Sequence, residues 1–146
     1  PDAMIVWTHR RPLDAITSFS SLVCTLQSGF SNVINPLAIG KHEVQHFSKI
    51  VSKGMLDRSA LGHRQIFDVN YSALCSDPIS VIASLYDHFD MQLSNEAESR
   101  MRKYLIQRPK DLYGEHTYSP DDFGLDEMRE KELYSSYLSC FDDYLH

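Results

Sequence analysis

The sequence predicts an α/β fold built around a parallel sheet, and three observations support that prediction. Helical patterns alternate with two short apolar runs, Met4–Trp7 and Ile66–Tyr71, as in folds whose parallel strands are joined by helices. The first run is too short for a helix and suits a strand buried on both faces, and the second is expected to form another strand. Two strands beside four or five helices leave a parallel sheet without the neighbours it needs. We therefore expect one partial domain over residues 1–146, the C-terminal part of a three-layer α/β/α fold.

The first predicted strand leads through a basic turn into an amphipathic helix. The turn is His9-Arg10-Arg11-Pro12, and the helix has one apolar face, formed by Ile16, Phe19, Val23 and Leu26. Pro12 suits the first helical position, and Asp14 complements the helix dipole. A strand, a basic turn and a helix N-terminus favour anion binding, because free backbone N–H groups and arginines converge there.

The remaining pattern predicts four more helices. Pro36 and Gly40 are expected to break any longer element. A helix is then expected over about 41–56. After the second strand, Asp77-Pro78 begins another helix, and Ser94 caps the next one, over 95–106. Residues 108–124 contain two prolines and two glycines and are expected to be irregular. A single helix over 126–144 follows, with an inward face of Glu130, Tyr134, Tyr137, Leu138 and Phe141.

Composition narrows the classes of partner and compartment. The chain carries a net charge of −6, and its segment 120–146, with eight acidic and two basic residues, accounts for all of it. This balance indicates neither a nucleic acid nor an anionic membrane as partner. The sequence shows no apolar run long enough for a membrane span and no signal-peptide pattern. Three widely spaced cysteines (Cys24, Cys75 and Cys140) suggest reduced thiols and a cytoplasmic location.

The first strand and helix resemble a segment of a known family. Arg10-x-x-x-Asp14-x-x-x-Ser18 after a buried strand resembles the 3′-phosphate-binding segment of sulfotransferases that use PAPS (3′-phosphoadenosine 5′-phosphosulfate). The resemblance implies that Arg10 and Ser18 bind the 3′-phosphate of this donor. It also implies a P-loop nucleotide-hydrolase-like fold, no metal, and a small-molecule, glycan or lipid acceptor with a hydroxyl or amine group.

Two later segments extend the resemblance. FDVNYSALCSDP, from Phe67 to Pro78, resembles a second block of the family, in which the tyrosine adjoins the adenine, here Tyr71. RPKDLYGEHTYSPDDFGL, residues 108–125, resembles the last cofactor-binding loop of the bacterial-type branch, which implies roles for Lys110, Gly114 and His116. The R-K-G triplet of the cytosolic enzymes is absent, and Tyr118-Ser119-Pro120-Asp121 is also a favourable turn without any ligand.

Parts of the family's machinery do not occur in this sequence. The glycine-rich loop that binds the 5′-phosphosulfate is absent, and the family's general base usually precedes the region present here. Catalytic residues are therefore expected upstream of Pro1. Sulfuryl transfer depends on positioning and charge stabilisation, so we expect the chain alone to bind the 3′-phosphate end weakly and to transfer nothing measurable. The oligomeric state stays open.

Two other functions stay open as alternatives. His42-Glu43-Val44-Gln45-His46 has the H-E-x-x-H pattern of zinc metallopeptidases, in which the histidines bind zinc and the glutamate is the general base. No G-x-x-H follows, so a third ligand would have to come from His63, Asp57 or Asp68. A solvent-facing polar stripe, with Val44 and Phe47 turned inward, explains the same segment without metal. The other alternative is a non-catalytic interaction module that packs on another subunit.

Overall fold

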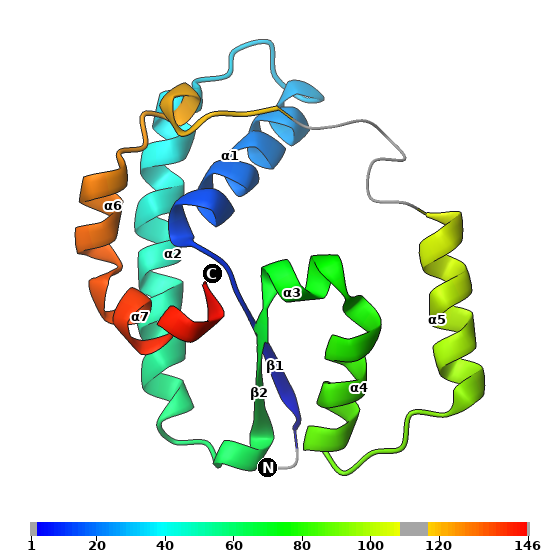
Figure 1. Cartoon of the computed structure of the whole chain (residues 1–146). Coiled ribbons are helices and arrows are strands. Elements are labelled where there is room, and N and C mark those ends of the chain that lie inside the picture. Colours follow the sequence, from blue (N-terminus) through cyan, green and yellow to red (C-terminus); the bar gives the residue numbers. More distant parts are fainter. Residues whose placement is uncertain (1–2, 109–116, 146) are drawn as a thin grey trace. The chain divides into compact units, whose positions relative to one another are not determined.

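A parallel two-stranded sheet and seven α-helices make up the part of the chain that the computed structural model describes, residues 3–108 and 117–145 (Figure 1). The strands are β1 (Ile5–His9) and β2 (Ile66–Asn70), and Ile5 pairs with Ile66 and His9 with Asn70. The predicted α/β class and the parallel pairing are confirmed. The chain divides into two compact units, one from residues 1–9 and 61–116 and the other from 10–60 and 117–145. Whether they belong to one partial domain stays a prediction.

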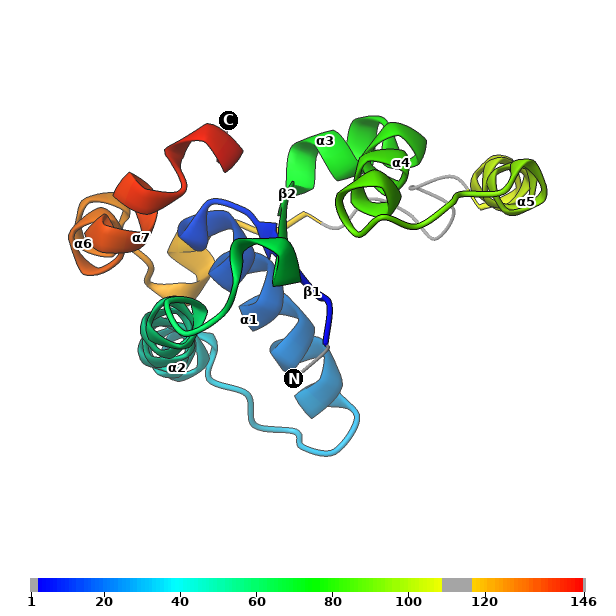
Figure 2. The ribbon, with the colours of Figure 1, turned by 90° about the horizontal axis from the view of Figure 1, so that it is seen from below.

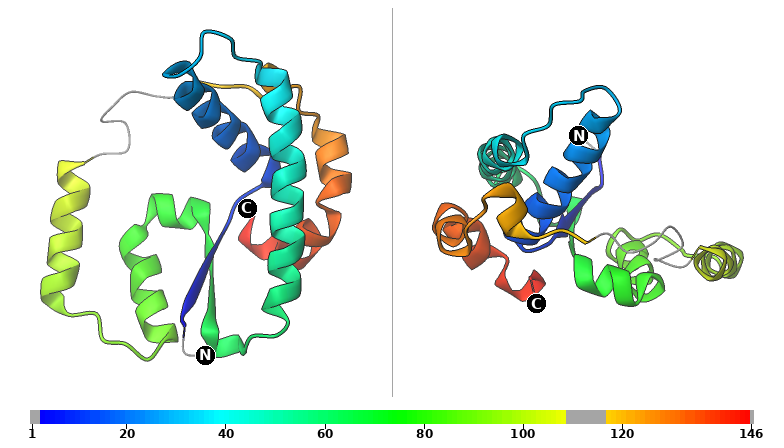
Figure 3. Two further views of the ribbon diagram at one scale, coloured as in Figure 1. Left: turned by 180° about the vertical axis from the view of Figure 1, so that it is seen from behind. Right: turned by 90° about the horizontal axis from the view of Figure 1, so that it is seen from above.

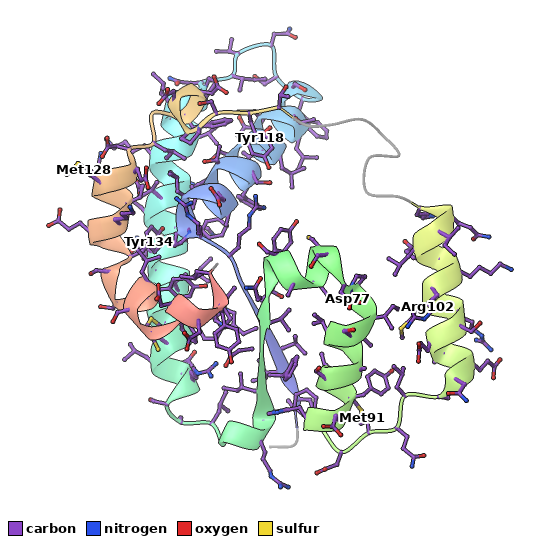
Figure 4. The ribbon with its side chains drawn as sticks, in the orientation of Figure 1. Asp77, Met91, Arg102, Tyr118, Met128 and Tyr134 are labelled. Atoms are coloured by element: carbon purple, nitrogen blue, oxygen red, sulfur yellow. The ribbon has the colours of Figure 1, made fainter. Side chains whose placement is uncertain are left out.

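The first unit contains both strands and three helices, α3 (Tyr71–Ser76), α4 (Pro78–His88) and α5 (Asn95–Gln107). A side-chain oxygen caps each helix: Asn70 accepts from the Ala73 N–H, Asp77 from Ser80 and Ser94 from Ala97. The helix starts predicted at Pro78 and Asn95 are therefore confirmed. The Ser80 hydrogen bonds, with a smaller contribution from Arg102 of α5, lower the pKa of Asp77 (Figure 4).

The first strand differs from its prediction in length and in burial. It extends two residues further, to His9, and Met4 lies outside it. Val6 is 46% exposed, and Thr8 beside it in the same strand is also exposed. The expectation of a strand buried on both faces was wrong for this chain. The face of β1 that carries Val6 and Thr8 is therefore partly exposed in the described residues.

The second unit packs helices around one apolar core. Its helices are α1 (Pro12–Ser28), α2 (Pro36–Arg58), α6 (Glu127–Leu133) and α7 (Ser135–Cys140). Figure 2 shows α2 and α6 nearly end-on, and Figure 3 shows α1 and α2 from two further sides. Short 3₁₀ turns occupy Pro120–Phe123 and Asp142–Tyr144. The core comprises Ile16, Val44, Phe123, Leu125 and Tyr134.

The buried face of α1 is rotated from the predicted one. Ile16 is fully buried as expected, but Phe19 is 39% and Leu26 is 58% exposed. The buried stripe instead includes Thr17 and Ser20, which lie beside Ile16, while the partly exposed Phe19 still contacts Phe47 of α2 with ring centroids 5.2 Å apart. Hydrophobicity alone therefore misplaced this face, because two hydroxyl residues take core positions. The Thr17 hydroxyl donates to the Leu13 carbonyl at 2.6 Å, which satisfies it inside the helix.

Helix α2 starts five residues earlier than predicted. Pro36 opens it at the first helical position, where a missing N–H costs nothing, and the Asn35 side chain caps it through the Ala38 N–H. Gly40 lies inside the helix rather than before it. A Cβ at Gly40 would lie 2.2 Å from the Phe123 carbonyl oxygen. Neither residue therefore interrupts the helix: Pro36 begins it, and Gly40 leaves room for the backbone of Phe123.

The last predicted helix is broken at Tyr134 into α6 and α7. Its predicted inward face is nevertheless correct, because Glu130, Tyr134, Tyr137 and Phe141 are all buried and Leu138 packs against the core. Tyr134 points toward α2 (Figure 4), where its hydroxyl donates to the Val44 carbonyl oxygen at 2.7 Å. Burial, reinforced by the charge of Glu130, raises the pKa of Tyr134, so the hydroxyl keeps its proton as a donor.

The substitution Tyr134→Phe is expected to lower the free energy of unfolding by about 1–2 kcal/mol, because it removes a buried hydrogen bond. Urea denaturation followed by circular dichroism measures this loss. Tyr104→Phe is the control, since Tyr104 is 57% exposed and should change stability little. Equal midpoints for Tyr134→Phe and wild type would show that this hydrogen bond contributes nothing to the stability of the fold.

Candidate functional site

The N-terminus of α1 is where the sequence predicts an anion site. Arg10 directly follows β1, Arg11 is the N-cap residue, and Pro12 is the first helical residue. No described side chain caps this end, and the Ala15 N–H is the donor that closes the first turn, onto the Arg11 carbonyl at 3.0 Å. The preceding N–H groups of Leu13 and Asp14 have no acceptor within the helix. Positive charge and free N–H groups therefore occur together here, as anion sites require.

Ser18 and Asp14 lie one turn apart on α1, and both are half-buried. They share a stripe of the helix beside the buried face of Ile16, Thr17 and Ser20. The structure thus places Arg10 just before the helix and Ser18 in its second turn. Arg11 forms a loose pair with Glu127 of α6 at 3.5 Å, and both side chains are about half exposed. That exposure makes the pair weak.

The other predicted cofactor residues fall elsewhere. Tyr71 is half-buried and is the first residue of α3, directly after β2, in the first unit. Lys110, Gly114 and His116 lie outside the described residues. The segment that follows them forms a turn at the start of the Pro120–Phe123 3₁₀ helix: the Ser119 N–H donates to Oδ2 of Asp122 at 2.8 Å, and the Ser119 Oγ accepts from the Asp121 N–H at 3.3 Å. The turn predicted there from the sequence is therefore confirmed.

A buried histidine–aspartate pair at the end of β1 was missed by sequence reasoning, which assigned His9 to the basic turn. His9 is fully buried, and its Nε2 lies 2.8 Å from Oδ1 of Asp68 in β2. The His9 ring stacks on Trp7 at 5.3 Å between centroids. Parallel pairing brings these residues together, since Trp7 opposes Asp68. A signal did exist for Asp68, a carboxylate inside the second predicted strand, whereas His9 lies outside the first predicted strand.

The H-E-x-x-H residues lie on α2 in an arrangement unlike the one predicted. Glu43 is buried, and its Oε1 lies 2.9 Å from Nδ1 of the exposed His42. The expected solvent-facing stripe was therefore wrong at Glu43, although Val44 and Phe47 do turn inward. Two possible third ligands have other partners, Asp68 with His9 and Asp57 with Lys53 at 2.8 Å. Within 3–108 and 117–145, no three His, Cys, Asp or Glu residues are grouped to hold a metal.

Beside the N-terminus of α1 is a cavity of about 40 Å³, lined by residues of α1, α6 and α7. Its wall includes Pro12, Leu13 and Leu138, together with Glu130, which is only 4% exposed. The Oε2 atom of Glu130 has no hydrogen-bond partner among the described residues. Burial raises the pKa of Glu130, partly offset by Arg129, because a desolvated carboxylate is costly.

The raised pKa of Glu130 makes stability depend on pH. The folded protein holds this proton more tightly than the unfolded chain, so the contribution of Glu130 to stability falls as pH rises from the usual 4.5 through the raised value. Glu130→Gln is therefore expected to stabilise the fold at pH 7.5 by about 1 kcal/mol and to change little at pH 4. Thermal melts of both proteins at the two pH values measure this. A constant difference across that range would contradict it.

The cysteine thiols contribute little chemistry to the candidate site. Cys24, Cys75 and Cys140 are all free, and burial raises the pKa of the Cys24 thiol. A raised pKa makes Cys24 a poorer nucleophile, in keeping with a packing role.

Among the described helices, none has the length and apolar character that crossing a bilayer requires.

Comparisons with known proteins agree on the family. A model described as the sulfotransferase family matches residues 1–95. Among solved structures, sulfotransferase STF9 from Mycobacterium avium is 28% identical, with a TM-score of 0.85 over 97% of this chain and 37% of that one. Sulfotransferase STF1 from Mycobacterium tuberculosis is 29% identical, with a TM-score of 0.77 over 93% of this chain and 34% of that one.

The chain thus spans little more than a third of the length of either solved sulfotransferase. A comparison with curated proteins found no match. The α/β fold with its parallel sheet is that of the two sulfotransferase structures, and the family match covers the strand, the basic turn, α1 and the second strand. The chain belongs to the sulfotransferase family.

Proposed function

We propose that this chain supplies the 3′-phosphate-binding part of a PAPS-dependent sulfotransferase. The observation that carries the proposal is Arg10, which follows the last residue of β1 and directly precedes the N-cap residue of a helix that no described side chain caps. A phosphate monoester carries nearly two negative charges and suits such a site. Arg10 would pair with its oxygens through the guanidinium fork, and Ser18 would donate its hydroxyl.

The other residues have secondary roles in this proposal. Tyr71 would adjoin the adenine, since a phenol ring can stack on a base and keep its hydroxyl at a polar edge. Lys110, Gly114 and His116 would contact the cofactor as the family resemblance implies. The acceptor would be a small molecule, glycan or lipid with a hydroxyl or amine group, and the reaction would leave 3′-phosphoadenosine 5′-phosphate (PAP). A cytoplasmic location is part of the same proposal.

In the transfer step, the acceptor oxygen or nitrogen forms a bond to sulfur while the bond from sulfur to the bridging oxygen of PAPS breaks. The acceptor's proton passes to a base, and the leaving PAP carries the electron pair of the broken bond. Arg10 and Ser18 would act by holding the donor in place, which supplies the orientation that in-line displacement needs. The groups that stabilise the leaving oxygen and accept the proton would come from outside these 146 residues.

Calorimetric titration of the chain with PAP, adenosine 5′-phosphate and inorganic phosphate tests the proposal. PAP should bind more tightly than adenosine 5′-phosphate, which lacks the 3′-phosphate. At about 100 times its Kd, PAP should also stabilise the fold by roughly 2.7 kcal/mol in a thermal melt. Equal binding of the two nucleotides would contradict a 3′-phosphate site.

The same thermal melts distinguish the two alternatives. A shift with Zn²⁺ that is lost in His42→Ala would favour the metallopeptidase alternative. A cooperative melt that neither PAP nor Zn²⁺ moves would favour a non-catalytic interaction module. The buried Glu43 beside His42 weighs against the first, because a zinc-peptidase general base must reach the metal-bound water.

A further inference from the structure

The histidine–aspartate pair that joins β1 to β2 is an unusual way to hold two short strands together. His9 is completely buried and the Asp68 side chain is only 11% exposed, with Nε2 and Oδ1 2.8 Å apart. Burying such groups costs desolvation, and an aliphatic pair of similar size often stabilises a fold equally well. What the polar pair adds is directional geometry, because a hydrogen bond fixes where the imidazole ring lies.

Two contacts hold the His9 ring at once. The hydrogen bond to Asp68 crosses from β1 to β2, and the stack on Trp7, with ring planes 24° apart, runs along β1. The link to β2 is diagonal, since His9 itself opposes Asn70 and Trp7 opposes Asp68. The final residue of β1 is therefore fixed both across the sheet and along the strand.

The pair lies immediately before the residues proposed to bind the cofactor. Arg10 follows His9 directly, and Tyr71 follows β2 three residues after Asp68. We infer that His9 and Asp68 are positioning residues for the 3′-phosphate site, which fix the end of β1 and thereby aim Arg10. This inference rests on the proposed function. A guanidinium that is held in place before the ligand arrives loses less freedom on binding, so the pair raises affinity without touching the phosphate.

The substitution Asp68→Ala tests the inference by comparing two nucleotides. Positioning of Arg10 predicts that PAP binds about tenfold more weakly to Asp68→Ala, while adenosine 5′-phosphate binds as it does to wild type. Asp68→Asn should keep most of the PAP affinity, because an amide can hydrogen-bond to Nε2 in either histidine tautomer. Equal losses for both nucleotides would overturn the inference, because partial unfolding weakens every ligand alike.

A second variant covers the case in which Asp68→Ala does not fold. His9→Phe keeps a flat ring against Trp7 and removes the hydrogen bond, so it should give the same selective loss of PAP affinity. Unchanged PAP affinity in a folded His9→Phe protein would overturn the inference.

A double-substitution cycle identifies the residue through which the pair acts. If Asp68 acts through Arg10, then Asp68→Ala should weaken PAP binding in the wild-type background and have no further effect in Arg10→Ala. A full tenfold loss in the Arg10→Ala background would overturn the inference while leaving the proposed function intact. Failure of the wild type to prefer PAP over adenosine 5′-phosphate would instead refute the proposed function itself, and the inference with it.

Discussion

Replacing Gly40 by alanine should destabilise the second unit by about 2 kcal/mol or more. A Cβ at this position would lie 2.2 Å from the Phe123 carbonyl oxygen and 2.8 Å from the Phe123 Cβ. The first contact is with backbone, so no rotamer change relieves it. Helix α2 or the 120–123 turn would have to move, although both pack on the shared core. The gain of about 1 kcal/mol that alanine usually brings to a helix interior is smaller than this cost.

Gly29→Ala is the matched control for Gly40→Ala. Gly29 lies in the same unit with an ordinary φ of −73°, and its added Cβ would meet the Leu26 carbonyl oxygen at 3.4 Å. Its stability should stay within about 0.5 kcal/mol of wild type or rise slightly, because alanine restricts the unfolded chain. Chemical denaturation of the three proteins measures the comparison. Similar midpoints for both variants would mean that α2 and the turn adjust freely at Gly40.

Gly40 also illustrates where sequence reasoning about the fold reached its limit. Local signals placed the elements well: Asp77, Ser94 and Pro12 act at helix starts as their chemistry predicts. The same rules wrongly predicted that Pro36 and Gly40 lie before the helix and interrupt secondary structure there. Their actual roles depend on Asn35 as a cap and on the backbone of Phe123, some 80 residues away along the chain. A contact that distant has no local signature.

The helix break at Tyr134 has a similar origin. Apolar periodicity predicted the buried face of residues 130–141 correctly, because the core decides which side chains turn inward. It did not predict the break, which accompanies the bond from Tyr134 to the Val44 carbonyl. Tyrosine, unlike leucine, needs a partner for its hydroxyl when buried, and that partner lies on α2.

A candidate site could be proposed from the sequence only where its motif is continuous along the chain. Arg10 and Ser18 lie on one strand-turn-helix segment, so the resemblance of that segment to the sulfotransferase family led to a proposed phosphate site without knowledge of the fold. His9 and Asp68 are separated by 59 positions and meet only through parallel pairing of β1 and β2. A pair of residues on two different strands, such as His9 and Asp68, can be recognised only when the register of the strands is known.

Removing the guanidinium of Arg10 should be the most damaging change for cofactor binding. Arg10→Ala is expected to weaken PAP binding by roughly 1.5–3 kcal/mol, the usual contribution of a hydrogen bond to a charged group. That corresponds to about a 10- to 100-fold rise in Kd. Binding of adenosine 5′-phosphate and the thermal melt of the unliganded protein should change little, since Arg10 belongs to none of the buried core. Calorimetric titration with both nucleotides measures the difference.

Arg11→Ala is the natural control for Arg10→Ala, because the two arginines are adjacent and carry the same charge. Arg11 has about half of its side chain exposed and lies 3.5 Å from Glu127, so its removal should cost PAP binding much less. Arg10→Lys keeps the charge but loses the two-pronged fork, and should fall between wild type and Arg10→Ala. Equal losses for both arginines would indicate diffuse attraction of the anion. Unchanged affinity in Arg10→Ala would remove this residue from the site, since a paired guanidinium cannot be lost without effect.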